Sequence, residues 1–151
     1  MLQVDISQQV SLPATIGEAQ LGEWIRTAYL EPEQSTSAEV SVAVVEESAI
    51  QALNTEYRQQ PKPTNVLAFP AGNPVHGEPL HLGDIVLCAA VIEREAAAQD
   101  KQSAHHWAHM AVHGMLHLQG YDHIEPQQAA SMENLEIELL ARLGIANPYV
   151  H

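Results

Sequence analysis

The stretch that most constrains this chain runs from position 113 to position 123 and reads HGMLHLQGYDH. An α-helix turns by about 100° per residue, so His113 and His117 lie one turn apart on the same helical face. Gly120 adopts the left-handed conformation that ends a helix more readily than a residue with a Cβ. The chain then reverses and can return His123 to the two helical imidazoles. The spacing predicts a metal site made by His113, His117 and His123.

Three neutral imidazoles with one open position are typical of a catalytic zinc site, whereas a structural site normally has a fourth protein ligand. Ordinary helical histidines are the alternative, which three histidines and a correctly placed glycine disfavour. The spacing resembles the HExxHxxGxxH motif of the metzincin proteases. Gly114 stands where that motif has its general-base glutamate. This pattern therefore favours a hydrolase of another kind.

Further motifs accompany the histidine stretch: Tyr57-Arg58, KPTNVLAFP at 62–70, LGDI at 82–85 and HWAH at 106–109. With these motifs the chain resembles the bacterial endoribonuclease YbeY family of rRNA maturation factors. The resemblance extends over nearly the whole chain, from the first expected strand to the terminal Asn-Pro-Tyr. It implies that the three motif histidines bind one zinc ion and that Arg58 is important for RNA cleavage.

The resemblance also implies a biological role. It predicts a single-strand-specific, zinc-dependent endoribonuclease that acts in rRNA maturation, including late processing of the small-subunit rRNA 3′ end, and in ribosome quality control. The expected partners are an rRNA precursor and the small ribosomal subunit or its assembly factors, with neither DNA nor a membrane among them. A non-catalytic ribosome-assembly module with a structural metal stays open, because no general base is obvious. A metalloprotease is the third alternative, which Gly114 disfavours.

A loop rich in hydrogen-bond donors follows the second expected helix and is stiffened by two prolines. On the residues alone, Arg58 is more simply a surface arginine after a helix, and the family resemblance reverses that preference. A guanidinium matches two phosphate oxygens in a fork that lysine cannot reproduce. Lys62, Thr64 and Asn65 supply further donors and are predicted to hold the RNA backbone. We expect this loop to lie beside the metal site.

Three more polar residues are candidates for orienting the ligands. Asp84 lies in an apolar strand pattern, where a buried carboxylate needs a partner. We expect it either to hold a histidine or to pair with Arg58. His109 lies within about 40° of His113 on the helical wheel and is either a partner of the ligands, an RNA contact or a packing residue. Asp122 orients a ligand ring, acts as a base or bonds its own backbone in a turn.

The charge is unusual for an RNA-binding protein, because 6 basic residues stand against 19 acidic ones, a net charge of −13. RNA binding normally relies on Lys and Arg, so we expect binding to be local, metal-assisted or delivered by a partner. No apolar run approaches the roughly 20 residues of a membrane span, and no signal peptide is recognisable. The lone Cys88 is expected to be a small core residue. These features predict a cytoplasmic protein.

The hydrophobic pattern of the 151 residues predicts a single domain over residues 1–151. Thr15 and Glu18 form a potential capping box at the start of the first helix. The expected fold class is α/β (α+β), with a small mixed sheet of three to four strands packed with about five helices and the histidine helix buried at the centre. The expected strands cover 2–6, 39–44, 65–69 and 82–89, and the expected helices cover 15–30, 46–57, 90–99, 103–118 and 126–144.

Overall fold

The computed structural model describes residues 2–30, 37–71, 80–122 and 124–150. Within these ranges four strands form one sheet with the order β1-β2-β4-β3. The strands are β1 (Leu2–Gln8), β2 (Ala38–Val45), β3 (Val66–Pro70) and β4 (Leu80–Cys88). β1 and β4 both run parallel to β2, whereas the edge strand β3 runs antiparallel to β4. The sheet is therefore mixed, as predicted.

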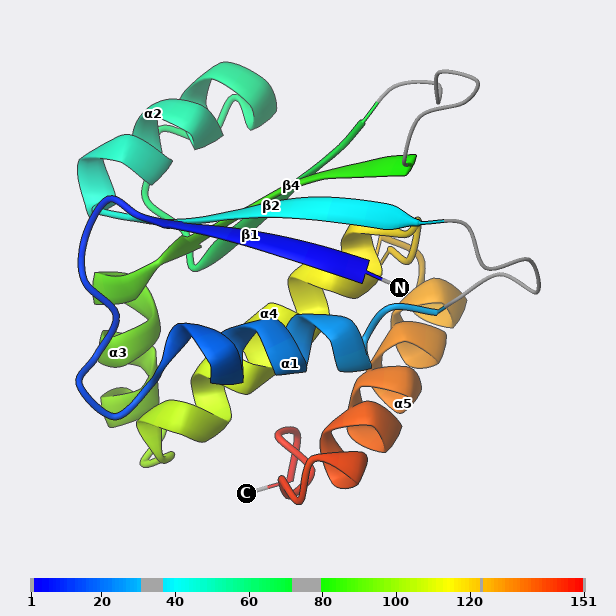
Figure 1. The fold of residues 1–151 in the computed structure, drawn as a ribbon. Helices are drawn as coiled ribbons and strands as arrows, with labels where there is room; N and C mark the ends of the chain where they lie inside the picture. Colours follow the sequence, from blue (N-terminus) through cyan, green and yellow to red (C-terminus); the bar gives the residue numbers. More distant parts are fainter. Residues whose placement is uncertain (1, 31–36, 72–79, 123, 151) are drawn as a thin grey trace.

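The described part of the chain also contains five helices. They are α1 (Glu18–Thr27), α2 (Glu47–Arg58), α3 (Ala89–Ala98), α4 (Ser103–Leu118) and α5 (Pro126–Arg142). Helices α1 and α4 lie on one side of the sheet and α2 lies on the other (Figure 1). The predicted α/β class, with its small mixed sheet and about five helices, is confirmed. No helix in the described ranges is both long enough and apolar enough to cross a membrane.

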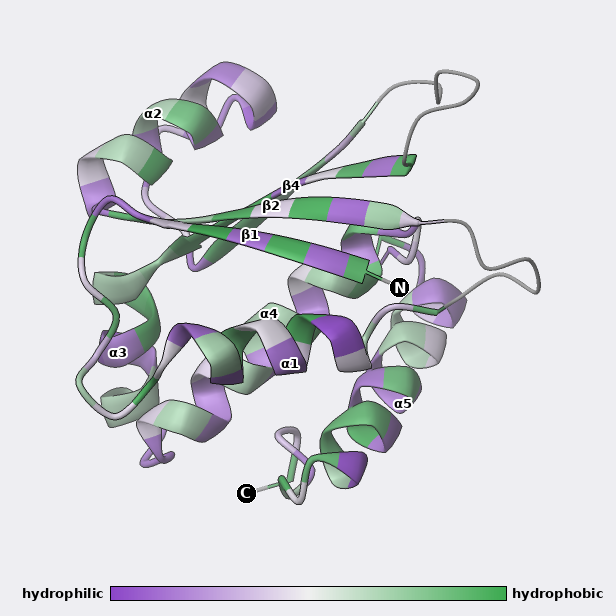
Figure 2. Cartoon of the chain, in the orientation of Figure 1, coloured by the Kyte–Doolittle hydropathy of each residue, from purple (hydrophilic) through white to green (hydrophobic). Residues whose placement is uncertain are grey.

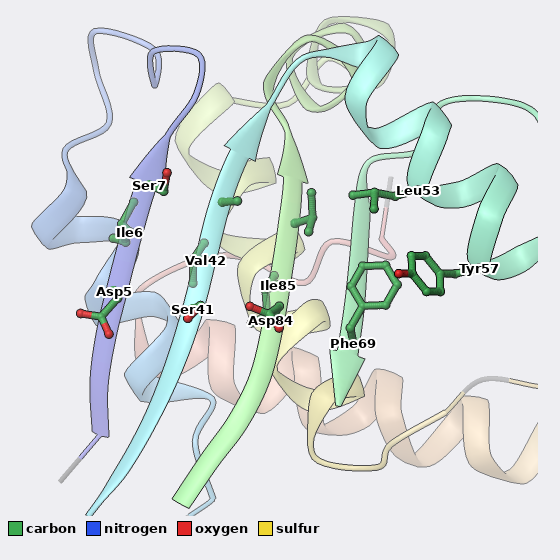
Figure 3. Close-up of a pocket in the computed structure, with 12 residues that line it drawn as sticks. Asp5, Ile6, Ser7, Ser41, Val42, Leu53, Tyr57, Phe69, Asp84 and Ile85 are labelled. Carbon is green, nitrogen blue, oxygen red and sulfur yellow. The ribbon is translucent and has the colours of Figure 1, made fainter. Parts of the chain in front are cut away.

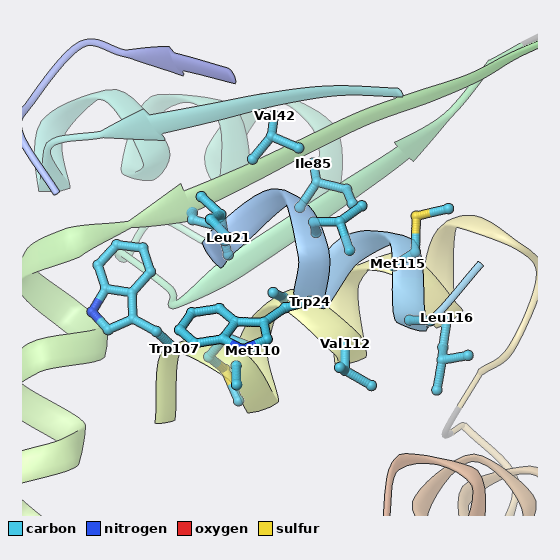
Figure 4. Packing of buried hydrophobic residues seen from close by; sticks show 14 of the residues in the cluster. Leu21, Trp24, Val42, Ile85, Trp107, Met110, Val112, Met115 and Leu116 are labelled. Carbon is cyan, nitrogen blue, oxygen red and sulfur yellow. The ribbon is translucent and has the colours of Figure 1, made fainter. Parts of the chain in front are cut away.

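The histidine helix α4 is the central element of the core. It contacts β3 and β4 as well as α1, α3 and α5, and most of its residues are buried. Figure 4 shows the side chains packed between α4, α1 and the sheet, among them Leu21, Trp24, Val42, Ile85, Trp107, Met110, Val112, Met115 and Leu116. Full burial of one large apolar side chain contributes about 1.5–3 kcal/mol. This packing makes α4 a rigid base for its histidines.

The strands follow the alternating pattern expected of a half-buried sheet. Figure 2 shows hydrophobic and hydrophilic residues in alternation along β1 and β2. The inward-facing valines of β2 belong to the main core, and Cys88 at the end of β4 is buried, as predicted. Burial raises the pKa of the Cys88 thiol, which agrees with a packing role.

The start of α1 differs from the sequence prediction. The helix begins at Glu18 with Gly17 at the N-cap, and no side chain caps it. Thr15 lies in a turn two residues before the N-cap. The Glu18 carboxylate instead accepts a hydrogen bond of 2.6 Å from Gln8 Nε2. The capping-box prediction for Thr15 and Glu18 is therefore wrong, because the turn displaces the threonine from the helix end.

Candidate functional site

A cleft of about 260 Å³ lies at the β3 edge of the sheet. It is lined by Arg58, Thr64, Asn65, Val66, Ala68, His113, Gly114 and His117. These residues come from the end of α2, the following loop, β3 and α4, segments that are far apart in the sequence. The structure thus brings the predicted donor loop beside the two helical histidines.

The two histidines project from successive turns of α4 with nearly parallel rings, whose centroids are 6.4 Å apart and whose planes differ by 9°. His113 Nδ1 lies 2.8 Å from Glu136 Oε1, and His117 Nδ1 lies 2.8 Å from the carbonyl oxygen of Tyr121. Each acceptor requires the Nδ1–H form of its ring, in which Nε2 is the nitrogen that carries the lone pair. Both rings are therefore prepared in the same tautomer.

The Gly120 turn provides the second of these acceptors. Gly120 has φ +102°, in the left-handed region that the sequence predicted for it. Tyr121 N–H then donates to the carbonyl oxygen of Leu116 at 3.1 Å, which folds the chain back over the helix end. This return carries the Tyr121 carbonyl to the His117 ring. The glycine that ends the helix thereby also orients a histidine.

The environment of His117 favours its neutral form. Burial lowers the pKa of His117, and the positive charge of Arg58 lowers it further. The Tyr121 carbonyl and the Asp122 carboxylate act in the opposite direction without reversing the shift. A neutral imidazole at pH 7 is the form that binds a metal ion.

Arg58 reaches this histidine from the other side of the cleft. It is the last residue of α2, one position further into the helix than predicted, and its side chain is exposed. Its Nη2 lies 3.3 Å from His117 Nε2. The guanidinium therefore stands next to the imidazole nitrogen that faces the cleft, within reach of an anion bound there.

Glu136 of α5 is a site residue that the sequence analysis missed. Its side chain is fully buried, and Oε1 accepts hydrogen bonds from His113 Nδ1 at 2.8 Å and His109 Nε2 at 3.1 Å. Burial alone would raise the pKa of Glu136, but the bonds from His109 and His113 outweigh it and lower the pKa to about 2. Glu136 is thus an ionised carboxylate behind the cleft. The sequence feature that could have indicated this role is a charged residue on the apolar face of α5, four positions after Met132.

Asn65, which is predicted to hold RNA, contacts the half-buried carboxylate of Glu95. Asn65 Nδ2 donates to Glu95 Oε1 at 3.0 Å, and Asn65 Oδ1 accepts from the N–H of Val66 at 2.7 Å. Glu95 Oε1 also lies 2.9 Å from His106 Nε2. These bonds hold the loop against α3 and α4. Asn65 also lines the cleft, and its contact with RNA stays a prediction.

The remaining candidates lie in different places. Thr64 lines the cleft, whereas Lys62 is exposed and outside the lining. Asp122 is half-buried beyond the Gly120 turn and acts on His117 through its charge. His123 lies outside the described residues. Among the residues that the structure does describe, no group of three potential ligands converges.

Asp84 is the clearest correction among the site residues. It is exposed and pairs in register with Ser41 and Phe69. It lines a separate cavity of about 510 Å³ on the side of the sheet that carries α2 (Figure 3). Its neighbour Ile85 points to the α4 side, because successive strand residues face opposite ways. The predicted pairing of Asp84 with a histidine or with Arg58 is therefore wrong.

Close packing favours glycine at position 114, where the metzincin motif has glutamate. A Cβ at this position would lie 3.0 Å from Val66 Cγ2 and 3.1 Å from Ile85 Cγ2. The helix thus approaches the sheet closely here, and a side chain at this position would require Val66 and Ile85 to move by a few tenths of an ångström. The close approach disfavours a protease-type base on this turn of α4.

We expect Gly114→Glu to lower the free energy of unfolding by about 3–5 kcal/mol and to create no peptidase, because it overpacks the core and buries a carboxylate. Gly17→Glu is the matched control, since no atom lies within 4 Å of its Cβ position. Urea denaturation followed by circular dichroism measures the effect, and casein hydrolysis tests for the peptidase. A stable Gly114→Glu protein that hydrolyses casein would restore the protease alternative.

Comparison with known proteins shows the family of this chain. The family model described as Endoribonuclease YbeY matches residues 4–144. A relative from Cellvibrio japonicus (strain Ueda107), described as endoribonuclease YbeY, is 48% identical over 147 residues, covering 97% of this chain and 82% of the relative. Another with the same description, from Alteromonas mediterranea, is 52% identical over 131 residues, covering 87% of this chain and 82% of the relative.

A solved structure supports the fold. The solution structure of a Thermotoga maritima protein is similar with a TM-score of 0.53 and 22% identity, and the match covers 100% of both chains. At this identity the likeness concerns the architecture alone. The family model and the two relatives extend over most of the sequence and support a hydrolase that acts on RNA. The chain belongs to the endoribonuclease YbeY family.

Proposed function

We propose that this chain is a zinc-dependent, single-strand-specific endoribonuclease that acts in rRNA maturation, late in the processing of the small-subunit rRNA 3′ end, and in ribosome quality control. The observation that carries the proposal is the distance of 3.3 Å between Arg58 Nη2 and His117 Nε2 in one cleft. A phosphate-binding cation beside a nitrogen that can bind a metal ion suits metal-assisted phosphodiester cleavage.

The donor chemistry of the cleft fits a zinc ion. His113 and His117 have their Nδ1 atoms bonded to oxygen acceptors, which is the usual arrangement of metal-binding histidines. We propose His123 as the third ligand, on the sequence motif alone. When bound, zinc would supply Lewis-acid polarisation of a phosphate oxygen or of water. Three imidazoles with an open position suit that role.

Side chains of the protein would bind the RNA and stabilise the transition state. The Arg58 guanidinium would bind the scissile phosphate and stabilise the negative charge that builds up on its oxygens during cleavage. The Thr64 hydroxyl, in the same lining, would donate to the RNA backbone. The described lining residues carry no carboxylate, so we assign the main stabilisation to the arginine rather than to a carboxylate base.

The charge of the protein bears on how RNA reaches the cleft. A net charge of −13 repels the phosphate backbone at a distance, so Arg58 provides local rather than general attraction. We therefore propose that the substrate is presented within a precursor of the small ribosomal subunit or by its assembly factors in the cytoplasm. Local recognition would also restrict cleavage to exposed single strands.

The test is cleavage of a labelled single-stranded RNA that spans the 3′ end of precursor small-subunit rRNA. We expect cleavage to disappear when the protein is treated with a chelator and to return on addition of zinc, while circular dichroism stays unchanged. A duplex RNA and a DNA of the same sequence are the controls and should remain intact. A protein that unfolds on chelation and never cleaves would instead be an assembly module with a structural metal.

A further inference from the structure

A hydrogen-bonded cluster of four residues lies directly behind the cleft, around the buried Glu136 carboxylate. His109 and His113 belong to α4, Glu136 belongs to α5, and Tyr149 follows α5 near the C-terminus. Glu136 Oε1 accepts from both histidines, at 3.1 Å and 2.8 Å, and Glu136 Oε2 accepts from the Tyr149 hydroxyl at 2.7 Å. One carboxylate therefore receives three hydrogen bonds from two other segments.

The protons of this cluster can be assigned from its contacts. His109 Nδ1 is buried and lacks a hydrogen-bond partner within the described part of the chain. A buried N–H without an acceptor is costly, so the His109 proton is on Nε2, from which it donates to Glu136. His113 must carry its proton on Nδ1 to donate to the same oxygen. Glu136 thus selects opposite tautomers for two histidines that are four residues apart.

The cluster can affect the cleft through His113, because His113 is the histidine of the cluster that also lines the cleft. A neutral imidazole in water favours the Nε2–H form, which would block the nitrogen that faces the cleft. The Glu136 carboxylate reverses that preference and fixes the plane of the ring. The Tyr149 hydroxyl occupies the second carboxylate oxygen, so the carboxylate cannot rotate away without losing a bond.

We propose that Glu136 is the positioning residue for His113, holding it as the Nδ1–H tautomer with Nε2 toward the metal site, and that Tyr149 keeps Glu136 in place. The proposal rests on the proposed function for the identity of the metal. It assigns the C-terminal segment a part in the site, although neither Glu136 nor Tyr149 lines the cleft.

The test replaces Glu136 and reads the tautomer of His113 directly. In the metal-free protein, two-bond ¹H–¹⁵N correlations of the imidazole should show Nδ1–H for wild type and predominantly Nε2–H for Glu136→Met. Zinc affinity, measured by competition with a chromophoric chelator, should fall about 10–100-fold. Glu138→Gln is the control, because Glu138 lies exposed on the same helix. It should leave the tautomer and the affinity unchanged.

Two milder variants keep the proposal testable if Glu136→Met does not fold. Glu136→Gln retains an acceptor oxygen, so His113 should stay Nδ1–H while zinc affinity falls about tenfold through the lost charge. Tyr149→Phe should weaken zinc binding by less than Glu136→Gln. An Nδ1–H ring in Glu136→Met, or wild-type zinc affinity in every Glu136 variant that folds, would overturn the proposal. Neither readout uses RNA, so failure of the wild type to cleave RNA would reject the proposed function separately.

Discussion

Replacing Arg58 by lysine is expected to slow single-turnover cleavage of RNA by about two to three orders of magnitude. Lysine keeps the positive charge but loses the planar fork that binds two phosphate oxygens together. The Arg58 side chain is exposed at the end of α2, so the substitution should leave the fold unchanged. The measurement is the rate on a labelled single-stranded precursor with excess enzyme, together with metal content and the urea midpoint.

A matched control distinguishes the loss of the two-oxygen contact made by the Arg58 guanidinium from a general effect of replacing an arginine. Arg94 is also exposed, pairs with Glu47 at 2.7 Å and lies outside the cleft. Arg94→Lys should therefore cleave at the wild-type rate. If Arg58→Lys and Arg94→Lys both cleave like wild type, Arg58 has no part in the reaction and the metal site acts without it.

His117→Ala is expected to reduce bound metal from about one ion per chain to nearly none and to abolish cleavage, because it removes one of three proposed ligands. The same substitution removes the acceptor of the Arg58 contact and the donor to the Tyr121 carbonyl. The ring is about half-buried at the rim of a cleft, so the fold should survive. Elemental analysis of the purified protein and the RNA assay together measure the result.

His81→Ala is the control for this experiment. His81 is an exposed histidine on β4, 3.6 Å from the exposed Glu39 carboxylate, and it takes no part in the cleft. Its replacement should change neither metal content nor cleavage. Full metal occupancy in His117→Ala would show that His117 is not a metal ligand. The predicted pair of ligands on α4 would then be wrong.

Local patterns were sufficient to predict most of the secondary structure. The predicted range of the histidine helix agrees with α4 at both ends, because its apolar periodicity and the glycine turn act within a few residues. Thr15 lies outside the helix that it was predicted to cap, because a short turn precedes the helix. The capping pattern does not specify the geometry of that turn. Local signals therefore predicted the elements well and their first turns less reliably.

Contacts between distant segments account for what the sequence did not reveal in the site. The face to which Asp84 points depends on the register with β2 and β3, which an apolar strand pattern does not specify. Glu136 lies in a helix with an amphipathic pattern, and nothing local to it indicates its partner His113, which is 23 residues away. Arg58 and His117 are 59 residues apart in the sequence, so no local pattern indicates the contact between them.

The position of Glu136 and Tyr149 in the chain has a consequence for the order of events during synthesis. Both residues follow α4, and Tyr149 lies 40 residues beyond His109, its contact on that helix. A nascent chain exposes α4 with its histidines well before the carboxylate and the hydroxyl that orient them have been translated. The newly made protein would therefore acquire a correctly oriented His113 only after α5 and the segment that carries Tyr149 have been synthesised and have folded against α4.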